Sequence, residues 1–198
     1  MDEGDSTKKQ GMHRLSSLGR KCFDLIEFDP DEELLLEIRK HPIGLFFIYI
    51  TGIFIAFSLI AVVTGLVSSG LIESVGLGGY EPVAVFIGFL LSVGIGVVTY
   101  INGFLYTHNV IFITNEKIAQ VIYITIFSRK VSQLGIGDAQ DVTVEQKSFL
   151  ARAYNYGTLT IETAGEQNNY VFNYVPNPYN ASKVIINSHE VNLKHYGN

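Results

Sequence analysis

Two long stretches of the chain contain no charged residue, and this feature limits most strongly how the chain can fold. They cover residues 43–67 and 83–105. Each exceeds the roughly 20 residues that an α-helix needs to cross a hydrocarbon core of about 30 Å. A helix in a water-soluble protein seldom stays apolar on every side for this length. We therefore expect a transmembrane two-helix hairpin over 43–105, with a connecting loop at 68–82.

The placement of lysine and arginine predicts how this hairpin is oriented. Seven basic residues precede the first span, none lies in the loop, and seven follow the second span. Cytoplasmic segments next to membrane helices carry the excess of lysine and arginine. The start of the chain, MDEGDSTKKQGMHRL, has no short apolar stretch before a small-residue cleavage site, so we expect no cleaved signal peptide. The expectation is a multi-pass protein of the cell (plasma) membrane with both termini cytoplasmic and the loop outside.

The residues before the first span divide into two segments. Residues 1–22 are rich in charge and poor in large apolar groups, which predicts a disordered cytoplasmic tail. Residues 23–42 form a juxtamembrane segment that Pro42 ends. Within it, residues 33–40 fit either a helical face or an alternating strand, and periodicity does not decide between them. As a strand, this element would add a seventh to the sheet expected further along the chain.

The residues after the second span have the pattern of a water-soluble sheet. Val142 and Val144 alternate with the polar Asp141, Thr143 and Glu145, and several other short runs repeat this rule. Alternation of this kind is typical of an antiparallel sheet with one face in water. Asn177 and Pro178 suit the start of a closing helix over 178–189. We expect one β domain over 106–192, large enough for its own core, and a short tail over 193–198.

This succession of elements resembles the bacterial pleckstrin-homology-like (PH-like) membrane proteins of the YdbS-like group. The residues that carry the resemblance are DEELLLEIRKHP before the first span, the central block from ITNEKIAQ to GTLTIETAG, and VPNPYNASKVI at the end. Together they cover roughly residues 31–190. The resemblance implies an α+β protein. Its transmembrane hairpin would be joined to a cytoplasmic PH-like antiparallel β-sandwich or barrel that a C-terminal helix closes.

The chain departs from lipid-binding PH domains in its basic residues. Domains that bind phosphoinositides place several lysines and arginines around the first hairpin turn, whereas this turn offers Lys117 beside Glu116. Residues 107–198 contain seven basic and seven acidic residues, a balance of zero. Attraction to an anionic leaflet needs a basic cluster near the surface. The candidate lipid-facing basic residues are Lys117, Arg129, Lys130 and Lys147.

Aromatic residues in the last third of the chain are candidates for a partner groove. Most of them should pack in the core and on the sheet surface. An extended peptide can add to the edge of a sheet, and pockets between side chains then give specificity. The candidate groove residues are Tyr156, Tyr170, Phe172 and Tyr174.

Small residues in the two spans are candidates for close packing between helices. Gly88, Ser92 and Gly96 recur at intervals of four, and so do Gly52 and Ala56. Small side chains let helix backbones approach closely in lipid, where apolar surface gives little drive for association. The packing they predict is either within one chain or between copies.

The residue types that catalysis or cofactor binding needs are not arranged for it. The five histidines contain no H-x-x-x-H pair, Cys22 is alone, and neither glycine-rich stretch has the spacing of a nucleotide loop. Asp138 and Asp141 read as solvated turn carboxylates. We expect His41 and His108 to anchor at the membrane interface. The prediction is therefore a non-enzymatic protein with no catalytic residue, cofactor, metal, small-molecule substrate or nucleic acid partner.

The function that these observations favour is docking or scaffolding. A PH-like domain at the cytoplasmic membrane face would bind protein partners or neighbouring copies, with membrane lipids around the hairpin. One alternative is an inner-leaflet lipid-contact or sensing module. A further alternative is a small oligonucleotide-binding-like (OB-like) barrel on a membrane hairpin, against which the predicted closing helix argues.

Overall fold

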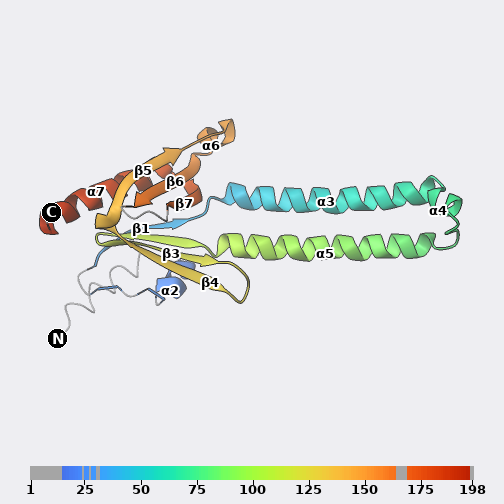
Figure 1. The fold of residues 1–198 in the computed structure, drawn as a ribbon, viewed down its shortest axis with the longest axis horizontal. Coiled ribbons are helices and arrows are strands. Elements are labelled where there is room, and N and C mark those ends of the chain that lie inside the picture. Colours follow the sequence, from blue (N-terminus) through green and yellow to red (C-terminus); the bar gives the residue numbers. More distant parts are fainter. Residues whose placement is uncertain (1–14, 24, 27, 30–31, 164–168, 197–198) are drawn as a thin grey trace. The chain divides into compact units, whose positions relative to one another are not determined.

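The computed structural model describes residues 15–23, 25–26, 28–29, 32–163 and 169–196 (Figure 1). The chain divides into two compact units, each described here by itself. One consists of Pro42–Tyr106, and the other combines Met1–His41 with Thr107–Asn198. The second unit is therefore built from residues on both sides of the first. The β domain that the sequence predicted over 106–192 therefore left out residues before the hairpin that belong to the same unit.

The unit at Pro42–Tyr106 consists of two long helices and their link. Helices α3 (Pro42–Ser68) and α5 (Glu81–Thr107) have 27 residues each, and the short helix α4 (Leu71–Ser74) lies between them. At 1.5 Å per residue each long helix measures about 40 Å, more than the hydrocarbon thickness of a bilayer. Their side chains are apolar and mostly exposed. By length and composition both helices can cross a membrane, and they contain the expected spans.

Small residues lie where α3 and α5 meet. The Ser92 hydroxyl donates to the Gly88 carbonyl at 2.9 Å and to the Ala56 carbonyl of the other helix at 3.4 Å. A Cβ atom added at Gly52 would collide with Thr99. Nothing lies within 4 Å of such an atom at Gly96. The structure thus places Gly52, Ala56, Gly88 and Ser92 between the two helices and Gly96 outside their contact.

We predict that Gly52→Leu lowers the thermal stability of the purified protein in detergent. The new side chain must push apart α3 and α5, and such overpacking costs about 1–3 kcal/mol. Gly96→Leu is the matched control, because the space around Gly96 is open. Circular dichroism melts of the two variants check this. Equal losses of stability would show that Gly52 does not mark the helix contact.

The larger sheet includes the segment at 33–40, for which the sequence pattern did not decide between helix and strand. It has the order β1-β2-β3-β4, with all neighbours antiparallel. The strands are β1 (Leu34–Arg39), β2 (Val110–Thr114), β3 (Lys117–Tyr123) and β4 (Arg129–Gly135). Residues 33–40 thus contain a strand and not a helix. Because β1 pairs with β2, the apolar hairpin is an insertion between two neighbouring strands of one sheet (Figure 1).

The smaller sheet has the order β5-β6-β7 and is also antiparallel. Its strands are β5 (Ala139–Glu145), β6 (Tyr156–Thr163) and β7 (Tyr170–Pro176). The 3-10 helix η1 (Ile136–Asp138) precedes it, and helix α6 (Phe149–Ala153) joins β5 to β6. The described strands form two separate sheets, so the barrel form of the expected fold is not present among them.

Helix α7 (Pro178–Tyr196) closes the domain, as the sequence predicted, but it is longer than 178–189. It runs through most of the residues expected to form a tail over 193–198. Ala181 and Ile185 on this helix are buried in one apolar core with residues of both sheets. The other buried members of this core are Ile38, Ile111, Ile113, Ile118, Leu134, Ile136, Ala139, Leu159, Ile161, Phe172 and Val175.

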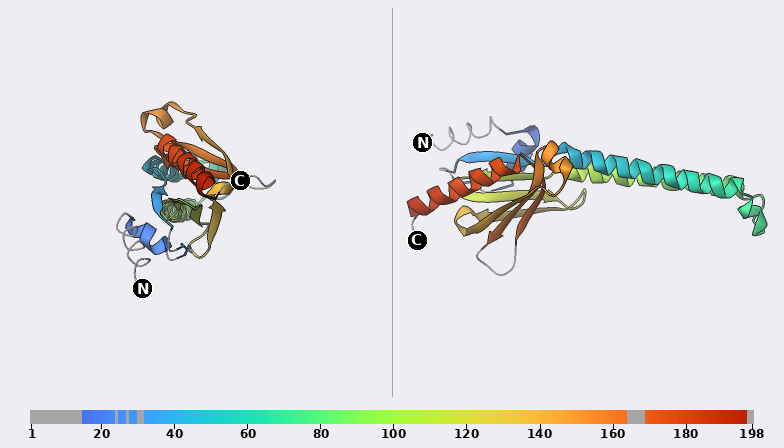
Figure 2. Two further views of the ribbon diagram at one scale, coloured as in Figure 1. Left: turned by 90° about the vertical axis from the view of Figure 1, so that its left-hand side faces the viewer. Right: turned by 90° about the horizontal axis from the view of Figure 1, so that it is seen from above.

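The opposite face of the larger sheet is also covered, by residues from the expected tail and from the start of the expected juxtamembrane segment. Helix α2 (Ser17–Phe23) and the residues around it pack on Val110, Phe112, Ala119 and Val121 of β2 and β3 (Figure 2). Phe23 and Phe28 stack at 4.0 Å and both meet the Phe112 ring edge-on. The prediction of disorder over 1–22 was therefore wrong for residues 15–22, while residues 1–14 lie outside the described part.

The all-apolar composition of β2 explains this second layer. All five residues of VIFIT are buried, as expected for a strand with both faces covered. The expectation of one wet face therefore does not hold for the larger sheet. The covering residues Leu15, Cys22 and Ile26 recur at the helical intervals of seven and four, but they lie in a short stretch rich in charge, which favoured a tail.

We predict that Cys22 is protected from thiol reagents in the folded protein. Its side chain is 1% exposed. Burial raises the pKa of the thiol, and Glu37 raises it further against the opposing effect of Arg129. Since the thiolate is the reactive form, labelling should be at least about tenfold slower than in denaturant. Cys22 is the sole cysteine of the chain, so a colorimetric thiol assay reads it directly. Equal rates in the folded and denatured protein would mean that α2 does not pack on the sheet.

Candidate binding surfaces of the two-sheet domain

The two sheets have a common end at which the chain leaves for the apolar helices. We call it the connection end, where β1 ends at Arg39 and β2 begins at Val110. The smaller sheet reaches it through His41, whose backbone N–H donates to the Tyr174 carbonyl at 2.6 Å. The His41 ring also stacks on Tyr156 at 5.3 Å, and burial lowers the pKa of this histidine. We call the opposite end, with the β2–β3 turn at residues 115–116, the distal end.

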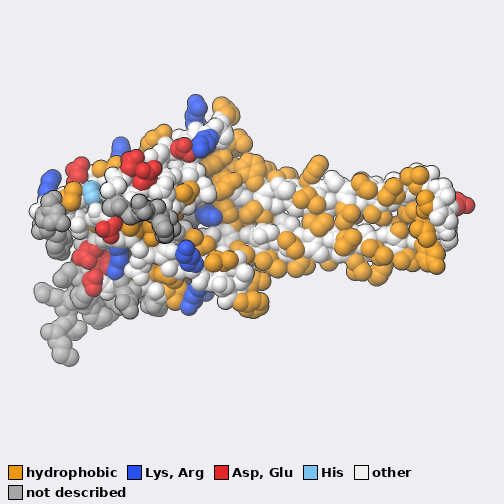
Figure 3. All heavy atoms as spheres, viewed as in Figure 1, with side chains coloured by type: hydrophobic (Ala, Val, Ile, Leu, Met, Phe, Trp, Pro, Cys, Tyr) orange, Lys and Arg blue, Asp and Glu red, His pale blue; other side chains and the backbone are white. Residues whose placement is uncertain are grey.

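Charges are segregated between these two ends. Among the described residues of the strands and their links, the connection end carries Arg39, Lys40, Arg129, Lys130, Lys147 and Arg152, against the carboxylate of Glu145, while Glu37 lies midway along β1. The distal half carries Asp29, Glu32, Glu33, Glu116, Asp138, Asp141 and Glu162, against Lys117, and α7 carries Lys183 near its start and Glu190 and Lys194 in its later turns. Figure 3 shows basic side chains over α6 and toward the turn of the β3–β4 hairpin. The net charge of zero over residues 107–198 therefore conceals an uneven arrangement, in which basic residues gather at one end of the domain and acidic residues in the other half.

Three of the four candidate lipid-facing basic residues lie at the connection end. Arg129 and Lys130 begin β4, and Lys147 lies between β5 and α6. The Lys147 ammonium is 2.7 Å from the Glu145 carboxylate, and both side chains are exposed. Lys117 lies at the distal end, where its ammonium is 2.9 Å from Glu32. The structure therefore separates Lys117 from the other three.

Two exposed apolar tips also lie at the connection end. The β3–β4 link carries Ile124, Ile126 and Phe127, and the Phe127 side chain is 96% exposed. Its turn is fixed by the Thr125 hydroxyl, which accepts from the Ser128 N–H at 2.9 Å. The second tip is α6, on which Phe149 is 83% exposed. Sequence reasoning missed both tips, because an apolar residue in a short link reads as part of the neighbouring strand.

A cleft of about 230 Å³ opens between the sheets beside β7. β7 is the last strand of its sheet, so one of its edges has no strand neighbour among the described residues. Burial lowers the pKa of Lys40, which lines the cleft. The lining combines aliphatic and amide side chains with this lysine: Ile38, Lys40, Asn109, Ile111, Gln120, Ile122, Val171, Phe172, Asn173, Tyr174 and Val175.

The four candidate groove aromatics do not share this cleft. Phe172 and Tyr174 line it, and Phe172 is also part of the core. Tyr156 stacks on Tyr174 at 5.7 Å and Tyr170 lies 6.4 Å from Phe172, but neither lines the cleft. Two of the four candidates thus lie on the cleft, and they are two of its eleven lining residues. The lining from β1, β2 and β3 depends on how the two sheets meet, which alternation does not reveal.

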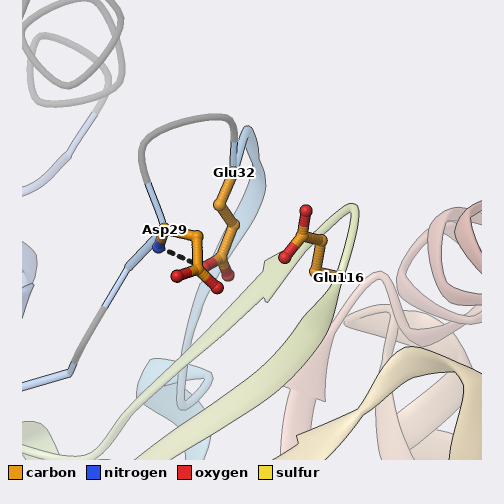
Figure 4. Close-up of side chains that lie close together, drawn as sticks. All are labelled: Asp29, Glu32 and Glu116. Carbon is orange, nitrogen blue, oxygen red and sulfur yellow. Dashed lines mark hydrogen bonds between the residues drawn. The ribbon is translucent and has the colours of Figure 1, made fainter. Parts of the chain in front are cut away.

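An acidic cluster lies at the distal end, where the sequence predicted no metal site. Oxygen atoms of Asp29, Glu32 and Glu116 lie within 4.8 Å of one another (Figure 4). The Glu32 side chain is fully buried, with one oxygen on the Lys117 ammonium and one without a hydrogen-bond partner. Carboxylate oxygens are ligands that calcium and magnesium prefer, so these residues could hold such a cation. Glu116 is 84 residues from Glu32, which is why the sequence gave no sign of the cluster.

We predict that Lys117→Met destabilises the protein by about 3 kcal/mol, because it leaves the buried Glu32 carboxylate without its cation. Lys147→Met removes an exposed pair and should change stability by no more than about 1 kcal/mol. Urea unfolding of both variants in detergent gives the comparison. Adding Glu32→Met to Lys117→Met should recover part of the loss. Similar small changes for both lysine variants would contradict a structural role for the Lys117–Glu32 pair.

Comparison with known proteins places this fold in a family. The family model of the bacterial PH domain matches residues 42–185, a range that includes both apolar helices and ends within α7. No curated protein and no solved structure gives a significant match. The chain belongs to the bacterial PH domain family, which confirms the resemblance seen in its sequence. PH domains are generally non-catalytic.

Proposed function

We propose that this protein is a non-enzymatic membrane protein whose PH-like domain docks an extended juxtamembrane segment of another membrane protein. Helices α3 and α5 anchor it in the cell membrane, with both termini and the domain on the cytoplasmic side. The docking site is the cleft beside β7. The observation that carries the proposal is this cleft, with its apolar and amide lining and the adjoining edge of β7.

The anchoring rests on two independent features of the chain. The two apolar helices are long enough to span a bilayer. Basic residues lie before the first and after the second, and none lies between them. By the excess of lysine and arginine on cytoplasmic segments, the link at 69–80 faces outward.

The chemistry of the cleft defines what it binds. Apart from the Tyr174 carbonyl, which accepts from His41, the outer edge of β7 offers backbone N–H and C=O groups to an added strand, and the aliphatic residues accept alternate side chains of that strand. Asn109, Gln120 and Asn173 can hydrogen-bond its backbone, and Lys40 favours an acidic side chain. Lys40 is two residues before α3, so the cleft is close in the chain to the first apolar helix. A segment next to a membrane span is therefore the partner that can reach it.

A photo-crosslinking amino acid at Val171, on the cleft, tests the proposal in native membranes. The same group at Thr143 is the control, because Thr143 is exposed on β5, the opposite edge of the same sheet. Mass spectrometry should map the Val171 adducts to a juxtamembrane segment of a second protein. The variant Asn173→Lys, which changes the lining of the cleft while the crosslinker stays at Val171, should abolish them.

Three results of this experiment separate the proposal from its rivals. Adducts to a second copy of this chain would replace partner docking by self-association. Adducts to lipid alone, or equal yields from positions 171 and 143, would overturn docking at the cleft. Adducts to one defined membrane segment that the lysine variant removes would support it.

A further inference from the structure

We propose that the two apolar tips at the connection end insert into the headgroup region of the membrane and hold the domain against an anionic leaflet. The tips are residues Ile124–Phe127 of the β3–β4 link and residues Phe149–Leu150 of α6. The inference rests on the membrane anchoring in the proposed function, but not on docking at the cleft.

Exposure is the first argument. Phe127 is 96% and Phe149 83% exposed, and Ile124, Ile126 and Leu150 are also exposed. The tips come from different sheets, yet both lie at the connection end. The β3–β4 link follows the pair Tyr123–Arg129, and α6 precedes Tyr156, on which His41 stacks. Large apolar side chains gathered on one end of a soluble domain mark an interaction surface.

The length of the chain connections indicates what this surface meets. Lys40 and His41 alone separate β1 from α3. Two residues likewise separate α5 from β2. Three Cα–Cα steps reach at most about 11 Å. If the helices cross a bilayer, the connection end is therefore held within about that distance of its surface.

Charge gives an independent argument for lipid over protein. The tips are flanked by Arg129 and Lys130 on one sheet and by Lys147 and Arg152 on the other. Carboxylates are concentrated in the distal half. Basic side chains near an anionic leaflet are attracted to it, and aromatic and aliphatic side chains between them bury their apolar surface at the headgroup boundary. This separation of basic from acidic residues orients the domain with its connection end toward an anionic leaflet.

Single tryptophans test the inference in the full-length protein, because the chain contains no tryptophan. We would reconstitute Phe127→Trp and Phe149→Trp in phosphatidylcholine–phosphatidylglycerol vesicles whose acyl chains carry bromine near the headgroups. Phe54→Trp, exposed near the middle of α3, reports anchoring in matched vesicles whose acyl chains carry bromine near their terminal methyl groups. Leu193→Trp, on the part of α7 near the distal end, is the control.

Both tip tryptophans should show blue-shifted emission and at least about twofold quenching by the brominated lipid, as expected for insertion at the interface. Leu193→Trp should stay unquenched. Replacing phosphatidylglycerol by phosphatidylcholine, or adding Arg129→Gln and Lys130→Gln, should reduce quenching of Phe127→Trp. Protection of Cys22 confirms that each variant is folded.

The controls separate the failure of this inference from failure of the anchoring. Quenching of Phe54→Trp without quenching of the tips would overturn the inference and leave the anchoring intact. No quenching of Phe54→Trp would remove the anchoring and the inference together. Quenching of Leu193→Trp equal to that of the tips would show that the connection end is not specifically oriented, and would also overturn the inference.

Discussion

The pairing of β1 with β2 is the interaction on which the rest of the structure depends. These strands are neighbours in the sheet although the whole apolar hairpin lies between them in the chain. Closing so long a loop costs conformational entropy, but this cost grows only slowly with the length of the loop. Here the inserted residues form a helical hairpin of their own, so its two ends return to the same side. Ile38 and Ile111, partners across this junction, are both buried in the core.

This arrangement explains which parts of the fold the sequence could predict. The apolar helices are marked by their length and lack of charge, the strands of the smaller sheet and the closing helix by a local period, and all were predicted. β1 was ambiguous because LLLEIR satisfies both periods, and its assignment depends on a partner more than 70 residues away. The role of residues 15–28 was missed for a related reason. Their few apolar side chains lie in a short stretch rich in charge, and the surface that they cover, the second face of β2, is far away in the sequence.

The binding surfaces were predictable to a smaller degree. The sequence indicated β7 through its aromatic residues, but Lys40 and Asn109 line the same cleft only because the insertion returns to its starting point. Counting charges suggested a neutral domain, whereas the register of the strands places the basic residues at one end. Position in the fold, rather than composition, thus decides what each surface offers to lipid or protein. The same holds for the cluster of Asp29, Glu32 and Glu116, which two chain segments far apart in the sequence bring together.

A cross-strand disulfide tests the central claim most directly. In a Cys22→Ala background, Leu36→Cys and Ile113→Cys would place two cysteines at paired positions of β1 and β2, within the Cα separation that a disulfide needs. A protease site in the link near Gly78 then cuts the chain between them. The account predicts that oxidised, cleaved protein in membranes stays one band without reductant and becomes two bands with it. Two bands without reductant, despite an oxidant that reaches both positions, would contradict the shared sheet.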